Sequence, residues 1–162
     1  MLIGVTGDTH NNLKNIIEIC TIFNKNGTDL VFHTGDISLP KSLLAFKKLN
    51  CPLIAVLGNN DVEEKNELVE AAKEFDCKIH DEPFSINLSK KKILILHHPE
   101  LINEELSNKY DLILHGHTHR YRLEKLNDCL IFNPGECAGI MKGKNQIGII
   151  NLKTLIPRVI NF

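Results

Sequence analysis

Histidines gather behind one short aliphatic run of this chain. The segment LILHGHTH, residues 112–119, places His115, His117 and His119 two residues apart. Imidazole nitrogens bind divalent transition metal ions and also exchange protons near neutral pH. A single histidine at a strand end is more often a polar residue with satisfied hydrogen bonds. The cluster therefore indicates a metal site only if donors from other parts of the chain converge on it.

Further donors follow four other aliphatic runs. They are Asp8 and His10 in GDTH, Asp36 in HTGD, Asn59, Asn60 and Asp61 in GNND, and His97 and His98 in LHHP. In open α/β sheets, ligands bind beyond the carboxyl ends of the strands because loops from several strands meet there. Five aliphatic runs that end in the same kinds of donor indicate one shared site.

The donor types indicate which ions such a site would hold. Carboxylate, imidazole and amide oxygen suit Mn, Fe, Ni, Co or Zn. The five cysteines contain no C-x-x-C pair, which argues against a thiolate zinc site and against a disulfide framework. A carboxylate such as Asp36 can bridge two ions through its two oxygens, and two ions about 3.5–4 Å apart can hold a water-derived nucleophile and a phosphoryl oxygen.

Alternating strands and helices position the donors in the first half of the chain. We expect strands at 2–8, 30–36 and 52–61, and helices at 13–23, 40–49 and 63–75. In the first helix, Leu13, Ile16, Cys20 and Phe23 recur at helical spacing, and Asn11 or Asn12 can cap it. Strand–helix–strand units of this length predict parallel strands with right-handed crossovers.

The second half is predicted to be mostly strands. We expect them at 77–81, 83–88, 92–98, 112–118, 120–126, 129–135, 146–152 and 156–162, with one short helix near 102–108. The pattern indicates an α/β fold in which two packed mixed β-sheets are flanked by helices, an αββα sandwich. Residues 1–162 are expected to form a single domain, given the chain's length.

Charge and hydropathy exclude several classes of protein. The net charge of −1 provides no overall field that would attract nucleic acid. No apolar run approaches the roughly 20 residues that span a bilayer. The first residues enter a strand-like segment directly, without the pattern of a secretion signal, so we expect a cytoplasmic protein with no membrane partner.

The order of the motifs D-x-H, GD, GNxD, H and GHxH resembles that of the calcineurin-like metallophosphoesterase superfamily, and in particular its small single-domain phosphodiesterases of bacteria and archaea. The segment NPGE at 133–136 is also similar to one these members carry near their site. By position, the resemblance implies that Asp8, His10, Asp36 and His119 hold one ion and that Asp36, Asn59, His97 and His117 hold the other.

The resemblance further implies a metal-dependent phosphodiesterase with two divalent cations as cofactor. Manganese is the first expectation, and Ni, Co, Fe or Zn are alternatives. A hydroxide that bridges the ions, formed because they lower the pKa of water from about 15.7 toward roughly 7, would attack the phosphorus in line. Asp36, as the bridge, and Asn60 are the expected catalytic residues.

Two positions depart from the family pattern. Many members carry histidine where this chain has Asn60, which donates a hydrogen bond but cannot deliver a proton near neutral pH. The asparagine therefore favours small phosphodiester substrates over monoesters with poor leaving groups. His98 replaces a glycine that is common there, and we expect His97 rather than His98 to be the ligand.

Other polar residues receive more ordinary interpretations. We expect His33 to lie behind the ligands or in the core, His115 to support its loop, His80 to lie at the surface, and Asp61 to anchor the GNND turn. The sequence assigns no role to Glu136, and Arg120 and Arg122 are expected to be ordinary surface charges.

Two other functions remain open. One is a non-catalytic interaction scaffold on the same fold, as in the related retromer subunit of eukaryotes. Such scaffolds tend to lose ligands, whereas every expected position is filled here. The other is a nuclease, against which stand the balanced charge and the absence of a basic, aromatic stripe for a single strand. A homodimer is compatible with the sequence.

Overall fold

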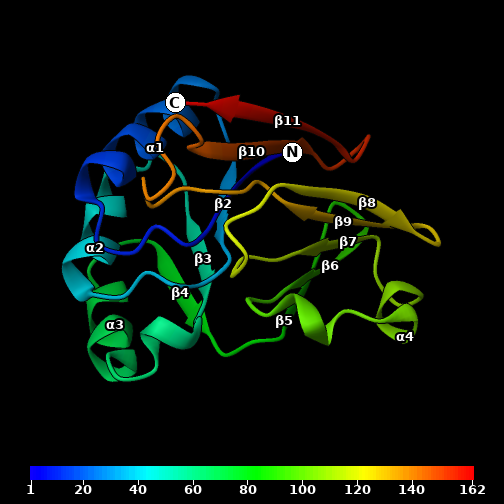
Figure 1. The fold of residues 1–162 in the computed structure, drawn as a ribbon, viewed down its shortest axis with the longest axis horizontal. Helices are drawn as coiled ribbons and strands as arrows, with labels where there is room; N and C mark the ends of the chain where they lie inside the picture. The colour runs from blue at the N-terminus through cyan, green and yellow to red at the C-terminus, as the bar shows by residue number, and fades with distance from the viewer.

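Two mixed β-sheets form the centre of the computed structural model, which describes residues 1–162 (Figure 1). The six-stranded sheet has the order β11 (Ile156–Asn161), β10 (Gln146–Asn151), β1 (Leu2–Thr6), β2 (Leu30–His33), β3 (Leu53–Val56) and β4 (Cys77–His80). The five-stranded sheet has the order β5 (Phe84–Leu88), β6 (Lys91–Ile95), β7 (Leu112–Leu114), β9 (Cys129–Asn133) and β8 (Arg122–Leu126). Strands β1 to β4 are parallel, as are β6, β7 and β9.

The helices lie on the outer faces of the two sheets (Figure 1). Helices α1 (Leu13–Lys25), α2 (Pro40–Ala45) and α3 (Lys65–Ala72) cover the six-stranded sheet, and α4 (Glu104–Ser107) lies beside the five-stranded sheet. The Asn12 side chain caps α1 by accepting the backbone N–H of Asn15. The expected α/β fold, two packed mixed sheets flanked by helices, is confirmed.

Alternating side chains of the central strands fill two apolar layers. Phe32 of β2 points into the core between the sheets, where it is fully buried with Ile95 of β6 and Leu114 of β7. Val31, its neighbour in the chain, packs on the opposite face, in one apolar cluster with Phe23 of α1. Burying each such side chain stabilises the fold by about 1.5–3 kcal/mol. The two layers hold the strand ends in a fixed relation, on which the site depends.

Several element boundaries differ from those expected from the sequence. Strand β3 ends at Val56, and residues 59–61 form a 3-10 turn instead of the end of a strand. Helix α2 gives way to a 3-10 turn at Phe46–Lys48, α3 begins only at Lys65, and α4 has four residues. The expected strands ran too far because the donor residues belong to the loops beyond the strands.

None of the helices combines the length and the apolar character that crossing a bilayer requires.

Candidate metal centre

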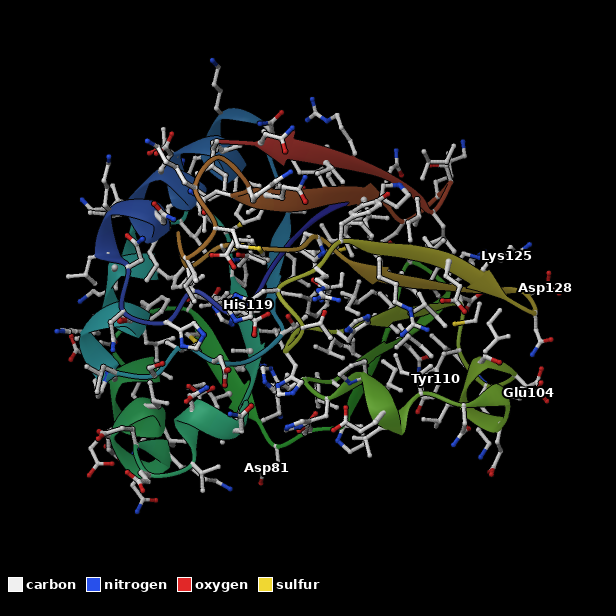
Figure 2. All side chains as sticks on the ribbon, in the orientation of Figure 1. Asp81, Glu104, Tyr110, His119, Lys125 and Asp128 are labelled. Atoms are coloured by element: carbon white, nitrogen blue, oxygen red, sulfur yellow. The ribbon has the colours of Figure 1, made fainter.

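Loops that follow β1, β2, β6 and β7 meet beyond the carboxyl ends of the parallel strands. The backbone N–H of His10 donates to the carbonyl of Asp36 at 2.9 Å, which joins the first two loops. The backbone N–H of His117 donates to both carboxylate oxygens of Asp8 at 3.0 Å. Figure 2 shows His119 near the middle of the molecule, far from peripheral residues such as Asp128. The expected donors therefore come together in one region.

Five of these donor residues have left-handed backbone conformations. The φ angles are 49° at Asp8, 44° at His10, 60° at Asp36, 70° at His117 and 52° at His119. Non-glycine residues rarely adopt positive φ, although Asp and His do so more often than most. Such conformations cost on the order of 1–3 kcal/mol each and gather at functional sites. The sharp bends turn side chains from different strands toward a common centre.

The first group of donors consists of Asp8, His10 and His119. The Nε2 atoms of the two histidines are 3.4 Å apart, and the rings are stacked with centroids 5.3 Å apart. The Nε2 of His119 lies 3.8 Å from Oδ1 of Asp8. One donor atom of each residue lies within 4.8 Å of the others, close enough for one ion to contact all three.

The second group consists of Asn59, His97 and His117. The Oδ1 of Asn59 lies 3.0 Å from Nε2 of His97 and 3.1 Å from Nδ1 of His117. The two histidine nitrogens are themselves 3.2 Å apart. These three donors come from loops that are separated by as many as 58 positions in the sequence, so only the tertiary fold brings them together.

Asp36 lies between the two groups. Its Oδ2 is 3.5 Å from Nε2 of His97 in the second group and 3.9 Å from Nε2 of His10 in the first. Asn60 donates to both of its carboxylate oxygens, through the backbone N–H to Oδ1 at 2.9 Å and through Nδ2 to Oδ2 at 2.7 Å. Asp36 thus has a carboxylate oxygen close to the donor nitrogens of both groups.

In His97 and His119, a hydrogen bond made by one ring nitrogen determines that the other ring nitrogen faces the centre without a proton. The Nδ1 of His97 donates to the carbonyl of Thr34 at 2.9 Å, which leaves Nε2 with its lone pair. This nitrogen faces Asn59 Oδ1, which is also an acceptor. The Nδ1 of His119 lies 2.5 Å from Oε2 of Glu136, so its Nε2 is free in the same way. A cation between facing acceptors would satisfy both of them, and the donor set therefore fits divalent metal ions.

The buried carboxylates also indicate that the centre accommodates positive charge. Burial raises the pKa of Asp8 to about 7, and the nearby charge of Asp36 adds to this, whereas His119 acts against it. Burial also acts to raise the pKa of Asp36, but His97 and the hydrogen bonds from Asn60 outweigh it and lower the net pKa. A bound cation would favour the charged form of both groups.

His33 and Asp61 hold the donor-bearing loops in place, as the sequence led us to expect. Buried His33 is 2.9 Å from the Thr9 hydroxyl through Nε2, and its Nδ1 accepts the N–H of Gly35. The carboxylate of Asp61 accepts four backbone N–H groups, those of Asp36, Ile37, Ser38 and Gly58, at 2.6–2.8 Å. Asp61 thereby ties the turn after β3 to the loop after β2.

Two glutamates that sequence reasoning left without a role belong to the site. Glu136 pairs with His119, and its NPGE segment was the only signal that pointed to it. Glu82 pairs with Nδ1 of His98 and accepts the backbone N–H groups of His97 and His98 at 2.5 and 3.0 Å. No pattern in the sequence marks Glu82, which lies directly before a proline in the link between β4 and β5.

Other candidate residues lie outside the two groups. His115 is buried, and its Nδ1 faces the carbonyl of Gly116 in its own loop. Arg122 pairs with Glu124 on the exposed side of β8. His80 is half-buried instead of exposed, because its ring stacks on Phe84 with the centroids 3.6 Å apart.

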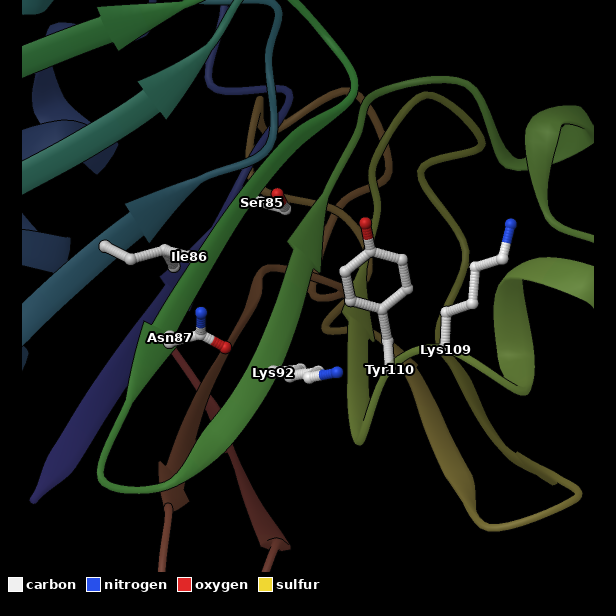
Figure 3. A pocket seen from close by; sticks show the side chains of 6 residues that line it. All are labelled: Ser85, Ile86, Asn87, Lys92, Lys109 and Tyr110. Atoms are coloured by element: carbon white, nitrogen blue, oxygen red, sulfur yellow. The ribbon is translucent and has the colours of Figure 1, made fainter.

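Two hollows on the surface differ in whether metal donors line them. One of about 780 Å³ opens beside the donors and is lined by His10, Asn11, Ser38, Leu39, Asn59, Asn60, Val62, Glu63 and Glu64. Another of about 280 Å³ lies on the five-stranded sheet and is lined by Ser85, Ile86, Asn87, Lys92, Lys109 and Tyr110 (Figure 3). The second contains none of the metal donors, whereas His10 and Asn59, from both donor groups, line the first, which makes it the candidate substrate pocket.

The fold and the donor groups define a protein of the metallophosphoesterase class. A family model described as the calcineurin-like phosphoesterase superfamily domain matches residues 1–155, and the chain belongs to this superfamily. It is 36% identical over 155 residues to phosphodiesterase MJ0936 of Methanocaldococcus jannaschii, covering 93% of each chain.

Solved structures agree with this assignment. The structure of an archaeal phosphodiesterase superposes with a TM-score of 0.87 at 34% identity, over 100% of each chain. Vps29 of Chaetomium thermophilum superposes with a TM-score of 0.71 over 100% of this chain and 94% of that one. At 15% identity, the second likeness shows the fold alone.

Proposed function

We propose that this protein is a metal-dependent phosphodiesterase with a dinuclear centre. Each ion would be held by four residues, and Asp36 would be shared. Asp8, His10, Asp36 and His119 would hold one ion, and Asp36, Asn59, His97 and His117 the other. The observation that carries the proposal is the position of the Asp36 carboxylate, whose Oδ2 lies 3.5 Å from His97 and 3.9 Å from His10.

Two divalent ions would supply a water-derived nucleophile at neutral pH and neutralise the charge that develops on the phosphoryl oxygens. The protein's contribution is to hold the histidine donors in fixed tautomers. His97 and His119 each keep one nitrogen free because the other donates, to Thr34 and to Glu136 respectively. Asp61 fixes the loop that carries Asp36, so the shared carboxylate keeps its place between the two groups.

The surroundings favour a diester as the substrate. Asn60 occupies the position at which many family members carry histidine, and its amide donates to Asp36. The amide cannot protonate a leaving oxygen, so the site suits esters whose leaving group needs little assistance. The adjoining pocket is lined by polar side chains, by two apolar ones and by Glu63 and Glu64, with no lysine or arginine. Such a lining disfavours polyanions and supports a small phosphodiester over nucleic acid.

The proposal is tested by hydrolysis of bis(4-nitrophenyl) phosphate by protein that has been stripped of metal and then resupplied with Mn²⁺. Activity should require the added ion and should fall by at least about 100-fold in Asp36→Ala and His97→Ala. Asp128→Ala is the control, since this aspartate is fully exposed at the tip of the β8–β9 hairpin (Figure 2). Full activity of the two site variants in metal-free buffer would refute the proposal.

The two competing hypotheses make different predictions. A non-catalytic scaffold need not bind two ions, so the metal content of the purified protein separates it from the enzyme. A nuclease would cleave DNA or RNA under the conditions that support aryl diester hydrolysis. We expect bound metal and no nucleic acid cleavage.

A further inference from the structure

We propose that His98 is an additional histidine ligand at the second metal position and biases that position toward ions that prefer nitrogen donors. This inference rests on the proposed dinuclear centre and adds a residue that the family motif does not supply. The chain has histidine there in place of the glycine that the family pattern favours.

The position of the His98 ring carries the inference. Donor atoms of His97, His98 and His117 all lie within 4.8 Å of one another. The ring centroid of His98 is 4.7 Å from that of His117 and 4.8 Å from that of His97. The side chain of His98 is about one-quarter exposed, at 27%, so an arriving ion can reach it. The three imidazoles therefore lie together, and Asn59 places its Oδ1 beside two of them, those of His97 and His117.

Glu82 holds His98 in the form a ligand needs. One of its carboxylate oxygens contacts Nδ1 of His98, and the other accepts the backbone N–H groups of His97 and His98. With Nδ1 acting as the donor, the lone pair of a neutral His98 ring is on Nε2. Glu136 and His119 show the same arrangement on the other side of the centre. Carboxylate–histidine pairs of this kind orient histidines that bind metals.

The extra imidazole has a consequence for metal choice. Without His98, the second position would have one carboxylate, one amide oxygen and two imidazoles. A third imidazole increases the share of nitrogen donors, which suits Zn, Ni and Fe, whereas oxygen donors suit Mn and Mg. The second position should therefore prefer Zn²⁺ over Mn²⁺ more strongly than it would without His98.

The experiment compares His98→Phe with His80→Phe in otherwise intact, metal-free protein. Both substitutions exchange an imidazole for a ring of similar size, and His80 stacks on Phe84 outside the donor groups. Calorimetric titration with Zn²⁺ and with Mn²⁺ measures the affinities. Proton NMR of the Co²⁺-loaded protein detects the shifted, exchangeable N–H signal that a metal-bound histidine gives.

We expect His98→Phe to weaken one Zn²⁺-binding step by at least about tenfold, since loss of even an outer partner of a ligand commonly costs 10–100-fold. Mn²⁺ binding should weaken less, and one shifted N–H signal should disappear. His80→Phe should change none of these. Unchanged Zn²⁺ affinity together with a complete set of N–H signals in His98→Phe would overturn the inference.

The outcomes separate this inference from the proposed function. Wild-type protein that binds fewer than two ions contradicts the dinuclear centre, whatever His98 does. Wild-type protein that binds two ions, with the same affinities and signals in His98→Phe, supports the dinuclear centre and rejects His98 as a ligand. If His98→Phe fails to fold, His98→Ala replaces it in the same comparison, with the melting temperature of the metal-free protein as the check on folding.

Discussion

The carboxylate of Glu136 lies 2.5 Å from Nδ1 of His119 and accepts, through its other oxygen, the backbone N–H of Ile140 at 2.8 Å. One buried side chain therefore connects a histidine of the proposed metal centre to the loop that follows β9. The connection orients the imidazole and selects which of its nitrogens faces the centre.

Replacing Glu136 should weaken the first metal position. Glu136→Gln replaces the charged acceptor of His119 with a neutral amide, which orients the imidazole less strongly. We expect metal affinity to fall about 10–100-fold. Calorimetric titration of the metal-free protein with Mn²⁺ measures the change. Glu124→Gln is the control, because Glu124 pairs with Arg122 on an exposed strand. Equal affinities in the two variants would show that Glu136 does not orient the ligand.

Asp61→Asn should destabilise the fold and not only the site. The native carboxylate accepts four backbone N–H groups, and an asparagine turns an N–H₂ donor toward some of them. Since each unsatisfied buried donor costs about 1–3 kcal/mol, we expect a loss of roughly 3 kcal/mol in the free energy of unfolding. Urea denaturation of the metal-free protein checks the value, and exposed Asp76→Asn should change it by less than about 0.5 kcal/mol.

His33 should make the protein less stable as the pH falls. Burial lowers its pKa from 6.5 to about 3, so below pH 6.5 the unfolded chain takes up a proton at this residue that the folded protein does not. Stability is therefore lost as the pH falls from about 6.5 toward about 3, and this one group accounts for about 2 kcal/mol at pH 5.

The His33→Gln variant tests this pH dependence, because glutamine keeps a donor for Thr9 and does not titrate. Between pH 7 and pH 5, with EDTA present, the variant should lose about 2 kcal/mol less of its unfolding free energy than the wild type does. Half-buried His80 provides the comparison, and His80→Gln should have a smaller effect. Parallel pH profiles for wild type and His33→Gln would contradict the assignment.

Gly58→Ala should damage the second metal position. A Cβ atom at residue 58 would lie 2.3 Å from Oδ1 of Asp36 and 2.9 Å from Cε1 of His97, distances that force one of these groups to move. We expect at least about a tenfold loss of diesterase activity, since small misplacements of catalytic groups can cost about 100-fold. Gly143→Ala is the comparison: its φ of 73° also strains an alanine, but the new Cβ atom meets nothing within 4 Å and none of the donors, so its activity should stay near that of the wild type.

The donors could be predicted from the sequence because each follows its strand within a few residues. A buried aliphatic run that ends in Asp, Asn or His places that side chain just beyond the strand, at the edge where the loops of parallel strands meet. The pairing of Glu82 with His98 could not be predicted in this way, since it joins residues 16 positions apart across a link that carries no motif.

The positions at which the strands end could not be predicted from the local sequence either. The segment 52–61 was expected to be a strand to its end, yet its last residues form a turn. The cause is tertiary, because Asp61 folds back to accept N–H groups from the loop after β2. The position of Asp36 between the two donor groups likewise depends on that contact, and hydropathy alone gives no sign of it.

The left-handed bends at five donor residues imply a preorganised cage. The packing of the two sheets already provides the free energy needed to form those bends. An incoming ion therefore has to lose its hydration water, but its binding does not have to order a loop. Uptake and exchange of ions should then proceed without any unfolding step, at rates that depend on the aqueous chemistry of each metal.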